Sequence, residues 1–595
     1  MIGMPSQPAR NGYRHHRRGL VEGESRAEIS TGRSGFNRSA RRFRAGALIS
    51  IVATVLATGI LTTGCSTGEP DSQAATDVSA PPRNPWLTDS EYPITHFDSA
   101  ATDSTPVPGP TVTKELSDSD VDYVRTTYSG NPTIKYSGDD RIVLAPTMYG
   151  IQKILATGDE FEPIDFLPYP GANPPAPEAV EELLVATDAA VAAKDDAALV
   201  GLGQQADAAG IAYSKIPNGA YNMIDKDGYH YSVVEGMRVL KTTDDNAPRG
   251  DLRFDKVVEL QNAPLPEGTP EETVAAVRRP GSAIVGLGMT FDGHVVAGSD
   301  SALFLMNRDL DILSVFPLSD ERLENSFAID ESGIYAVTSR RMLKIAWNGE
   351  RLSIAEKDGG WEADYERSDP AIARAAGSLT RSGGSGTTPT LMGFGPDEDE
   401  LVIISDASSS GPNLVAFWRN EIPDNNTDTQ SGARPNRVAG KVKVDMSKVT
   451  LELSPTVLGH DVLASTTAYP QPAPNVWANI FAPGTTRPAP SGMQKFRWNS
   501  AENTFVKVWS NTDVDNSDIT VPSVSAETGL LYAASKKDGK YEYVAIDWNT
   551  GQLVARWPMP NESRNWNLFG GMVTPIGNGE FLAGGMFSIK RVSAG

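Results

Sequence analysis

At 595 residues the chain is long enough to bury a large core, and its 55 Gly and 42 Pro, with recurrent short apolar runs, favour an all-β repeat fold. Residues 1–64 carry ten Arg against three Glu, so the formal net charge of -22 leaves -29 on the rest, which repels phosphates and disfavours nucleic acid as a partner. The single cysteine, Cys65, excludes an intrachain disulfide and a Cys-based zinc site.

The N-terminal region, residues 1–64, is predicted to be an export signal. An Arg-rich leader is followed by the apolar residues 45–64 and then by Cys65. The segment LTTGC at 61–65 resembles a bacterial lipobox, although Thr62 stands where that family usually has Leu. The resemblance implies diacylglycerol on the Cys65 thiol, cleavage before it and a fatty-acyl chain such as palmitate on the new N-terminus.

A lipidated Cys65 would anchor the protein to the outer face of the cell membrane. The alternative is an uncleaved membrane anchor, because about 20 apolar residues suffice to span a bilayer. Arg41 and Arg42 leave both the general secretory and the twin-arginine export routes open.

The export signal is followed by a tether and then by the folded body. Residues 65–85 are small, polar or Pro and predict a flexible tether. We assign residues 86–595 to a single propeller domain. Its first part, within residues 84–111, is expected to lie as an extended strip over the body, since ring side chains are spaced among prolines: Trp86, Tyr92, His96 and Phe97.

Eight strand clusters follow, and their turns contain acidic residues and Gly. The Ala-rich residues 177–210 have apolar residues at three- and four-residue steps and predict two short inserted helices. We therefore expect an all-β fold, a β-propeller of seven or eight blades with a small helical insertion, whose closure leaves few free strand edges. The clusters cover residues 132–167, 220–240, 281–318, 325–355, 388–418, 457–509, 522–559 and 569–592.

Two resemblances accompany this pattern. The segment AIDWNTG at 545–551, followed by Trp557, resembles the repeat of quinoprotein-like (PQQ-like) propellers, where Asp and Thr-Gly form the outer turn and Trp packs between blades. Residues 84–104, 138–154, 324–330 and 384–393 resemble a family of uncharacterised secreted bacterial propeller proteins, which implies architecture only. Pyrroloquinoline-quinone dehydrogenases typically place the cofactor against an adjacent-cysteine disulfide, so PQQ is not expected here.

Calcium is the cofactor for which the sequence offers candidate ligands. Six-bladed lactonases and related propellers hold calcium in the central channel with oxygen ligands from the starts of inner strands, and Glu324, Asn325 and Asp406 resemble such positions. Asn222 is a further candidate. The alternative is that these residues cap blade ends, as Asn and Asp often do.

A second candidate site is the mouth of the channel. The Gly- and hydroxyl-rich residues Ser385, Gly386, Thr387 and Thr388 precede a strand and could offer N–H and hydroxyl groups to a ligand. Close packing between blades is the alternative explanation. The acidic residues 513–518 lack the Gly of an EF-hand loop and are predicted to be a solvated turn.

Three functions remain open at this level. We favour an envelope-anchored propeller that binds a protein, glycan or small molecule without catalysis. The alternatives are a calcium-dependent hydrolase or lactonase acting on a small ester, and a structural or assembly factor of the cell envelope.

Overall fold

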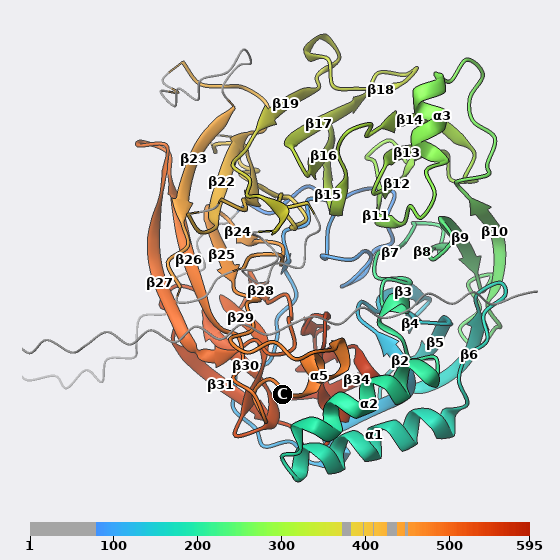
Figure 1. Cartoon of the computed structure of the whole chain (residues 1–595), viewed down its shortest axis with the longest axis vertical. Coiled ribbons are helices and arrows are strands. Elements are labelled where there is room, and N and C mark those ends of the chain that lie inside the picture. The colour runs from blue at the N-terminus through green and yellow to red at the C-terminus, as the bar shows by residue number, and fades with distance from the viewer. Residues whose placement is uncertain are drawn as a thin grey trace, which may run out of the picture. The chain divides into compact units, whose positions relative to one another are not determined.

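The computed structural model describes residues 79–371, 382–396, 398–408, 410–424, 426, 437–446 and 450–595. The export signal and Cys65 lie outside these residues. In the described part the strands form eight sheets, which follow one another around a central axis as the eight blades of a β-propeller (Figure 1). The predicted fold class is thus confirmed, and the number of blades is eight.

The first four blades, I to IV, are consecutive in the chain and antiparallel, with the first strand of each lying innermost. Blade IV ends in two short strands that both pair with β17. The strands are β3 (Thr133–Ser137), β4 (Asp140–Pro146), β5 (Gly150–Leu155), β6 (Glu162–Pro168); β7 (Asn222–Ile224), β8 (His230–Val234), β9 (Arg238–Thr243), β10 (Arg253–Glu259); β11 (Ile284–Met289), β12 (Val295–Ser299), β13 (Ala302–Met306), β14 (Ile312–Pro317); and β15 (Leu323–Asp330), β16 (Gly333–Thr338), β17 (Arg341–Trp347), β18 (Leu352–Ser353), β19 (Trp361–Asp364).

Blades V to VIII continue the ring, and the last two also contain strands from the N-terminal region. The strands are β20 (Thr390–Met392), β21 (Leu401–Ser405), β22 (Asn413–Trp418), β23 (Val438–Lys443); β24 (Thr456–Leu458), β25 (Asp461–Ser465), β26 (Ser491–Asn499), β27 (Thr504–Asp515); β1 (Ser104–Thr105), β28 (Ser523–Ser525), β29 (Leu530–Lys537), β30 (Lys540–Asp547), β31 (Leu553–Pro558); and β2 (Val121–Ser129), β32 (Thr574–Pro575), β33 (Glu580–Ala583), β34 (Gly585–Ser593).

The ring is closed by its two ends. Strand β2 is the outermost strand of blade VIII and pairs antiparallel with β34, so that Val121 lies opposite Val592. Because β2 continues into the first blade, its hydrogen bonds to β34 join the first blade to the last part of the chain. Strand β2 also pairs the edge of β34, which would otherwise expose a row of backbone groups.

The core lies between neighbouring blades. Central strands such as β13 are buried along their whole length, because the preceding blade covers one face of each sheet and the following blade covers the other. Trp557 illustrates this packing: its buried ring contacts Phe581 of blade VIII at a centroid distance of 5.3 Å. The outer turn of blade VII, to which Trp557 belongs, is held by Asp547. Its Oδ1 accepts hydrogen bonds from the amide and hydroxyl of Thr550, both at 2.7 Å.

The inserted helices cover only the part of the ring formed by blades I and VIII. Helix α1 (Pro177–Ala192) begins with Pro at its first turn, where the missing N–H is not needed. Helix α2 (Asp196–Ala208) is capped by Asp195, which accepts a hydrogen bond from Ala198 N. Their apolar faces join one cluster with α5 (Val476–Phe481) and Phe587 of blade VIII (Figure 1).

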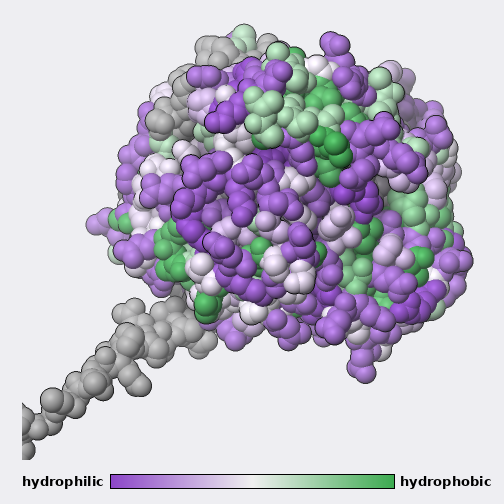
Figure 2. All heavy atoms as spheres, turned by 90° about the horizontal axis from the view of Figure 1, so that it is seen from below, coloured by the Kyte–Doolittle hydropathy of each residue, from purple (hydrophilic) through white to green (hydrophobic). Residues whose placement is uncertain are grey.

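The other helices of the described residues are short: α3 (Glu271–Val277) and the 3-10 turns at Asp118–Asp120, Tyr213–Lys215, Glu356–Asp358 and Arg564–Trp566. In the part of the chain that the structure describes, no helix is both long and apolar enough to cross a membrane. Figure 2 shows hydrophilic side chains over most of the face seen from below, with small separate apolar patches. Such a surface agrees with the strongly negative charge of the body.

The N-terminal strip does more than lie over the body, because residues 92–105 run inside the channel. Innermost strands leave backbone N–H groups facing the axis, and this segment supplies carbonyl acceptors for them. Six blades donate in turn: Ile134 N to Tyr92 O (2.9 Å), Ile224 N to Pro93 O (2.8 Å), Ile329 N to Ser99 O (2.6 Å), Leu391 N to Ala100 O (3.0 Å), Val457 N to Thr102 O (2.8 Å) and Val524 N to Asp103 O (3.0 Å).

The segment bends around the axis through backbone conformations that L-residues rarely adopt. His96, Phe97, Ala101 and Asp103 have φ of 72°, 70°, 56° and 56°. Left-handed conformations of non-glycine residues are unfavourable, so the hydrogen bonds to the blades must hold them. The N-terminal segment contacts blade III through a side chain, since Asn84 Nδ2 donates a hydrogen bond to Met289 O at 2.7 Å.

Candidate functional site

A pocket of about 440 Å³ opens at one end of the channel. Its wall on one side is the N-terminal segment from residue 79 to residue 107. On the other side lie Phe394, Gly459 and Ala526, which belong to turns between the first and second strands of blades V, VI and VII. We call it the channel-mouth pocket, and its volume is within the range of small-molecule sites.

Trp86 fixes the start of the N-terminal wall. Two cations lie near its ring, with Lys226 Nζ 4.0 Å and Arg308 Cζ 4.8 Å from ring centroids. It rests on Gly293, which has φ of +90° and where a Cβ would come within 2.6 Å of the ring. Both cation–π contacts and the glycine therefore hold Trp86 against blades II and III.

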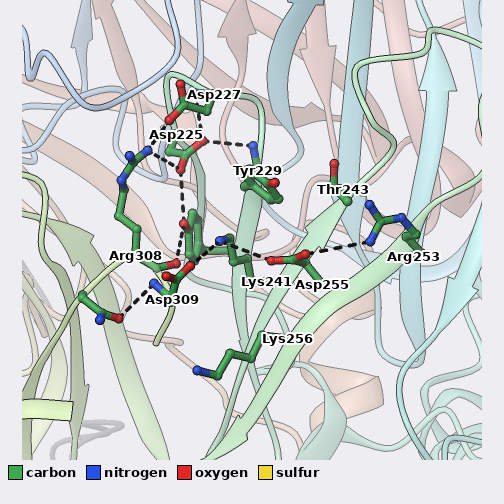
Figure 3. A network of polar contacts seen from close by, with 12 residues as sticks. Asp225, Asp227, Tyr229, Lys241, Thr243, Arg253, Asp255, Lys256, Arg308 and Asp309 are labelled. Atoms are coloured by element: carbon green, nitrogen blue, oxygen red, sulfur yellow. Dashed lines mark hydrogen bonds and ion pairs between the residues drawn. The ribbon is translucent and has the colours of Figure 1, made fainter. Parts of the chain in front are cut away.

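Arg308 is itself held by acidic residues of blade II (Figure 3). Its Nη1 contacts Asp227 and lies 3.3 Å from Asp225 Oδ2, while Asp225 Oδ1 accepts from Tyr229 N at 3.0 Å. Figure 3 also shows Lys241 between Asp309 and Asp255, at 3.2 Å from each. These ion pairs position Arg308 and join blades II and III.

Glu91 places a carboxylate in the wall of the pocket. Its Oε1 accepts from Tyr136 OH at 2.5 Å and from Arg141 Nη2 at 3.1 Å. Its Oε2 is buried, and no protein group donates to it. A buried acceptor without a donor is unfavourable, so the Glu91 carboxylate in the pocket wall is incompletely satisfied by the protein.

Asp98 lies in the floor of the same pocket. Thr102 holds it: the amide donates to Oδ1 at 3.4 Å and the hydroxyl donates to Oδ2. Burial raises the pKa of the Asp98 carboxyl to about 7, and the bonds from Thr102 only partly offset this effect. The charge of the floor therefore changes near neutral pH.

Beneath Asp98 lies a buried ion pair. His96 Nδ1 is 2.7 Å from Asp103 Oδ1, and the side chain of Asp103 is fully buried. Burial by itself would lower the pKa of His96, but the carboxylate of Asp103 more than offsets it, so the pKa is raised. The protonated imidazole therefore belongs to the native structure over a wider pH range than in a free peptide.

The structure brings together two of the residues singled out from the sequence. Asn325 Nδ2 donates to Gly386 O at 2.8 Å, and Asn325 Oδ1 accepts from Ser326 N at 2.9 Å and from Tyr221 OH. Tyr221 precedes blade II, whereas Asn325 belongs to blade IV and Gly386 precedes blade V. Asn325 thus joins three blades across the channel.

The other proposed calcium ligands have different surroundings. Asp406 serves its own hairpin, with Oδ1 accepting from Asn413 N at 2.8 Å and Oδ2 from Asn413 Nδ2 at 2.7 Å. Glu324 has a buried Oε1 to which no protein group donates. Asn222 links blades I and II, since its Nδ2 donates to Asn131 O at 2.9 Å. Within the described residues, no three His, Cys, Asp or Glu side chains are grouped so as to hold a metal ion.

The segment with Ser385, Thr387 and Thr388 is buried rather than open to the channel mouth. Ser385 N donates to Tyr365 OH at 2.9 Å, and a Cβ on Gly384 would come within 2.9 Å of Ser339 Cα. This glycine therefore permits close contact between blades IV and V, which is the alternative explanation from the sequence.

The acidic residues 513–518 correct another expectation, because they do not form a solvated turn. Asp518 is 4% exposed. Its Oδ1 lies 3.1 Å from Lys536 Nζ, and its Oδ2 accepts from Leu568 N at 2.7 Å. The segment joins blades VI, VII and VIII, and its burial follows from contacts with residues 18 and 50 positions away that no local pattern shows.

Sequence reasoning did not single out Glu91 or Asp98. Both belong to the strip at 84–111, which the sequence marked by ring side chains among prolines and by a resemblance that implied architecture only. A stronger signal was available in DSAATDST at 98–105, where small hydrogen-bonding residues allow a chain to pass through a narrow channel.

Comparisons with known proteins bear on the fold of this chain and give no information about the pocket. No protein-family model matches the chain. An uncharacterised protein of Archaeoglobus fulgidus is 30% identical over 304 residues, which is 46% of this chain and 54% of that protein. The chain thus spans about half the length of this relative.

Solved structures with similar folds include two titled as lactonases. A putative 6-phosphogluconolactonase of Bacteroides fragilis is 14% identical, covers 75% of this chain and 99% of that chain, and has a TM-score of 0.35. The periplasmic gluconolactonase of Pseudomonas aeruginosa is 12% identical over 56% of this chain and 83% of that chain, with a TM-score of 0.32. At such identities and TM-scores, these likenesses carry no argument about activity.

Proposed function

We propose that the protein is an extracytoplasmic, lipid-anchored propeller that binds a small molecule in the channel-mouth pocket. The pocket carries the proposal: it is concave, largely apolar in its wall and furnished with a few polar groups that converge on it. Glu91 Oε2 is a buried acceptor to which no protein group donates. The lipobox-like residues 61–65 support the anchor and the location outside the cell membrane.

The arrangement of the blades supports binding rather than mere scaffolding. The N-terminal segment is held by backbone bonds from six blades, and Trp86 is held by side chains of two blades. A pocket wall fixed at so many points is preorganised, and preorganisation lowers the free-energy cost of ordering the site when a ligand binds.

To test this proposal, a large side chain is introduced to fill the channel-mouth pocket. In Ala526→Trp the new ring would enter the pocket from the turn after β28, whereas Val185→Trp places the same ring on the exposed face of α1, where Val185 is 59% exposed. The full chain is purified from its own envelope, and small molecules that dissociate from it on denaturation are compared by mass spectrometry.

We expect one or more compounds to accompany the wild-type chain and Val185→Trp but not Ala526→Trp. A thermal-shift screen of small amphipathic compounds should show the same contrast. If the filled variant retains every compound and every thermal shift of the wild type, the channel-mouth pocket is not a binding site.

A further inference from the structure

The charged side chains of the channel-mouth pocket are mostly acidic. Three carboxylates, Asp89, Glu91 and Asp98, contribute to the described lining, against one cation, Arg83. Arg83 Nη2 lies 2.5 Å from Asp89 Oδ1, and both side chains are largely exposed, at 59% and 90%. The rim pair therefore neutralises itself, and the charges that face the interior are those of Glu91 and Asp98.

Glu91 is only partly neutralised by its neighbour. Arg141 Nη2 is 3.1 Å from Glu91 Oε1, but Arg141 Nη1 is also 3.4 Å from Glu580 Oε2, so one guanidinium serves two carboxylates. Glu91 Oε2 receives no protein donor. The Glu91 carboxylate in the pocket wall therefore keeps part of its negative charge uncompensated, which favours a positively charged donor in the pocket, because charge-assisted hydrogen bonds are the stronger ones.

A positively charged ligand group beside Glu91 would also affect the ionisation of Asp98. Its carboxylate lines the floor and accepts from the amide and hydroxyl of Thr102, and a backbone bond from Ala100 also favours its ionised form. Burial makes its ionised form unfavourable, as the raised pKa shows. A cation placed beside it would restore the ionised form, since opposite charge lowers the pKa of a carboxyl group.

The rest of the lining is apolar. Side chains from the N-terminal segment and from the turns of blades V and VI face the pocket: Pro93, Phe97, Val107, Phe394 and Leu458. Such walls bind an aromatic or branched aliphatic body through burial of apolar surface. An anionic ligand would meet two carboxylates in the same space.

We infer that the ligand of the channel-mouth pocket is an amphipathic amine, with an apolar body against the pocket walls and a protonated amine beside Glu91 and Asp98. The inference rests on the proposed function, because it names the ligand class of that same pocket. It also specifies which end of the ligand makes each contact.

The test uses three probes with one skeleton and different head groups: 4-phenylbutylamine, 4-phenylbutan-1-ol and 4-phenylbutyrate. Each is titrated calorimetrically into the full chain in lipid nanodiscs, with empty nanodiscs as the blank. We expect the amine to bind about tenfold more tightly than the alcohol, in keeping with a charge-assisted hydrogen bond, and the carboxylate not to bind.

Two conservative variants locate the charge. Glu91→Gln keeps the acceptor that holds Tyr136 and Arg141, and Asp98→Asn keeps the oxygen that accepts from Thr102 N. Each should weaken amine binding about fivefold or more and leave alcohol binding unchanged. The matched control is Asp89→Asn, which removes a carboxylate at the exposed rim and should leave both affinities within about twofold.

The outcomes separate the two proposals. If the amine and the alcohol bind equally, or if 4-phenylbutyrate binds most tightly, the ligand class is wrong while the pocket stands. If Glu91→Gln and Asp98→Asn both leave amine binding intact, the amine is not where we place it and the inference fails. If no probe binds and Ala526→Trp also retains every compound of the wild type, both the ligand class and the pocket are refuted.

Discussion

The imidazole Nδ1 of His96 lies 2.7 Å from the carboxylate Oδ1 of Asp103, inside the channel and within one segment of chain. Both residues have positive φ, and the amide of Val524 in blade VII holds the carbonyl of Asp103. The pair is therefore part of what keeps the N-terminal segment in place.

Removing one member of this pair should be strongly destabilising. His96→Asn leaves the Asp103 carboxylate buried without its partner, for which we expect a loss of about 3 kcal/mol in the free energy of unfolding by urea. Asn tolerates positive φ, so the backbone is not the cause. The double variant His96→Asn/Asp103→Asn is the control and should recover most of the loss. Equal losses in the single and double variants would contradict the pairing.

The pH dependence of this pair has a definite sign. The pKa of His96 is raised in the folded state, so its contribution to stability is complete below the unfolded pKa of about 6.5 and is lost as the pH rises through the folded pKa. The stability difference between the wild type and the double variant should accordingly shrink between pH 6 and pH 9. A difference that stays constant over this range would show that His96 does not titrate as we describe.

Asp98→Asn should change stability in the opposite sense to a lost salt bridge. The folded pKa of Asp98 is about 7, above its usual value of 3.8, so the wild type loses stability as the pH rises between these values. The Asn variant lacks this loss and should become increasingly more stable than the wild type up to about pH 7, with a constant difference above it. Urea denaturation of both chains, beside Asp89→Asn as the exposed control, measures this directly. A wild type that is more stable than the variant at pH 8 would refute the assignment.

Trp86→Ala should loosen the outer part of the N-terminal segment. Loss of a partly buried ring and of its contacts with Lys226 and Arg308 should cost about 2 kcal/mol. Amide hydrogen exchange should quicken in residues 84–91 and remain unchanged in blade V. Trp86→Phe keeps an aromatic face for the two cations and is expected to lose less. Unchanged exchange in residues 84–91 of Trp86→Ala would show that the ring does not hold this wall.

The calcium interpretation of Glu324, Asn325 and Asp406 leads to a different measurement. A site filled at 100 times its dissociation constant would raise the free energy of unfolding by about 2.7 kcal/mol. Since Asp406 serves its own hairpin and Asn325 joins blades, we expect the same melting temperature in excess chelator and in millimolar calcium. A calcium-dependent rise that Asn325→Ala abolishes would restore the metal-dependent hydrolase hypothesis.

Cys65→Ser tests the anchor. We expect the variant to lack the mass added by the lipid and to leave the detergent phase, because the thiol that would carry diacylglycerol is absent. Intact-mass measurement and detergent partitioning give both results. A variant that keeps the wild-type mass increment and still partitions into detergent would favour the alternative of an uncleaved anchor.

The sequence by itself determined the repeating hairpins, the eight strand clusters and the two helices at 177–210. These features depend on alternation, turn residues and helical spacing within about thirty residues, and such local preferences agree with the final structure. The closing strand β2 lies before the first of these clusters, and its partner β34 lies at the far end of the chain.

Only the tertiary structure decided the path of the N-terminal segment and the composition of the channel-mouth pocket. The carbonyl of Ser99 accepts from Ile329 and that of Thr102 from Val457, contacts that span more than two hundred residues. No periodicity marks a segment that is bound through its backbone, because carbonyl groups are the same in every residue. For the same reason Glu91 and Asp98 resemble ordinary polar residues until closure of the ring places them around one cavity.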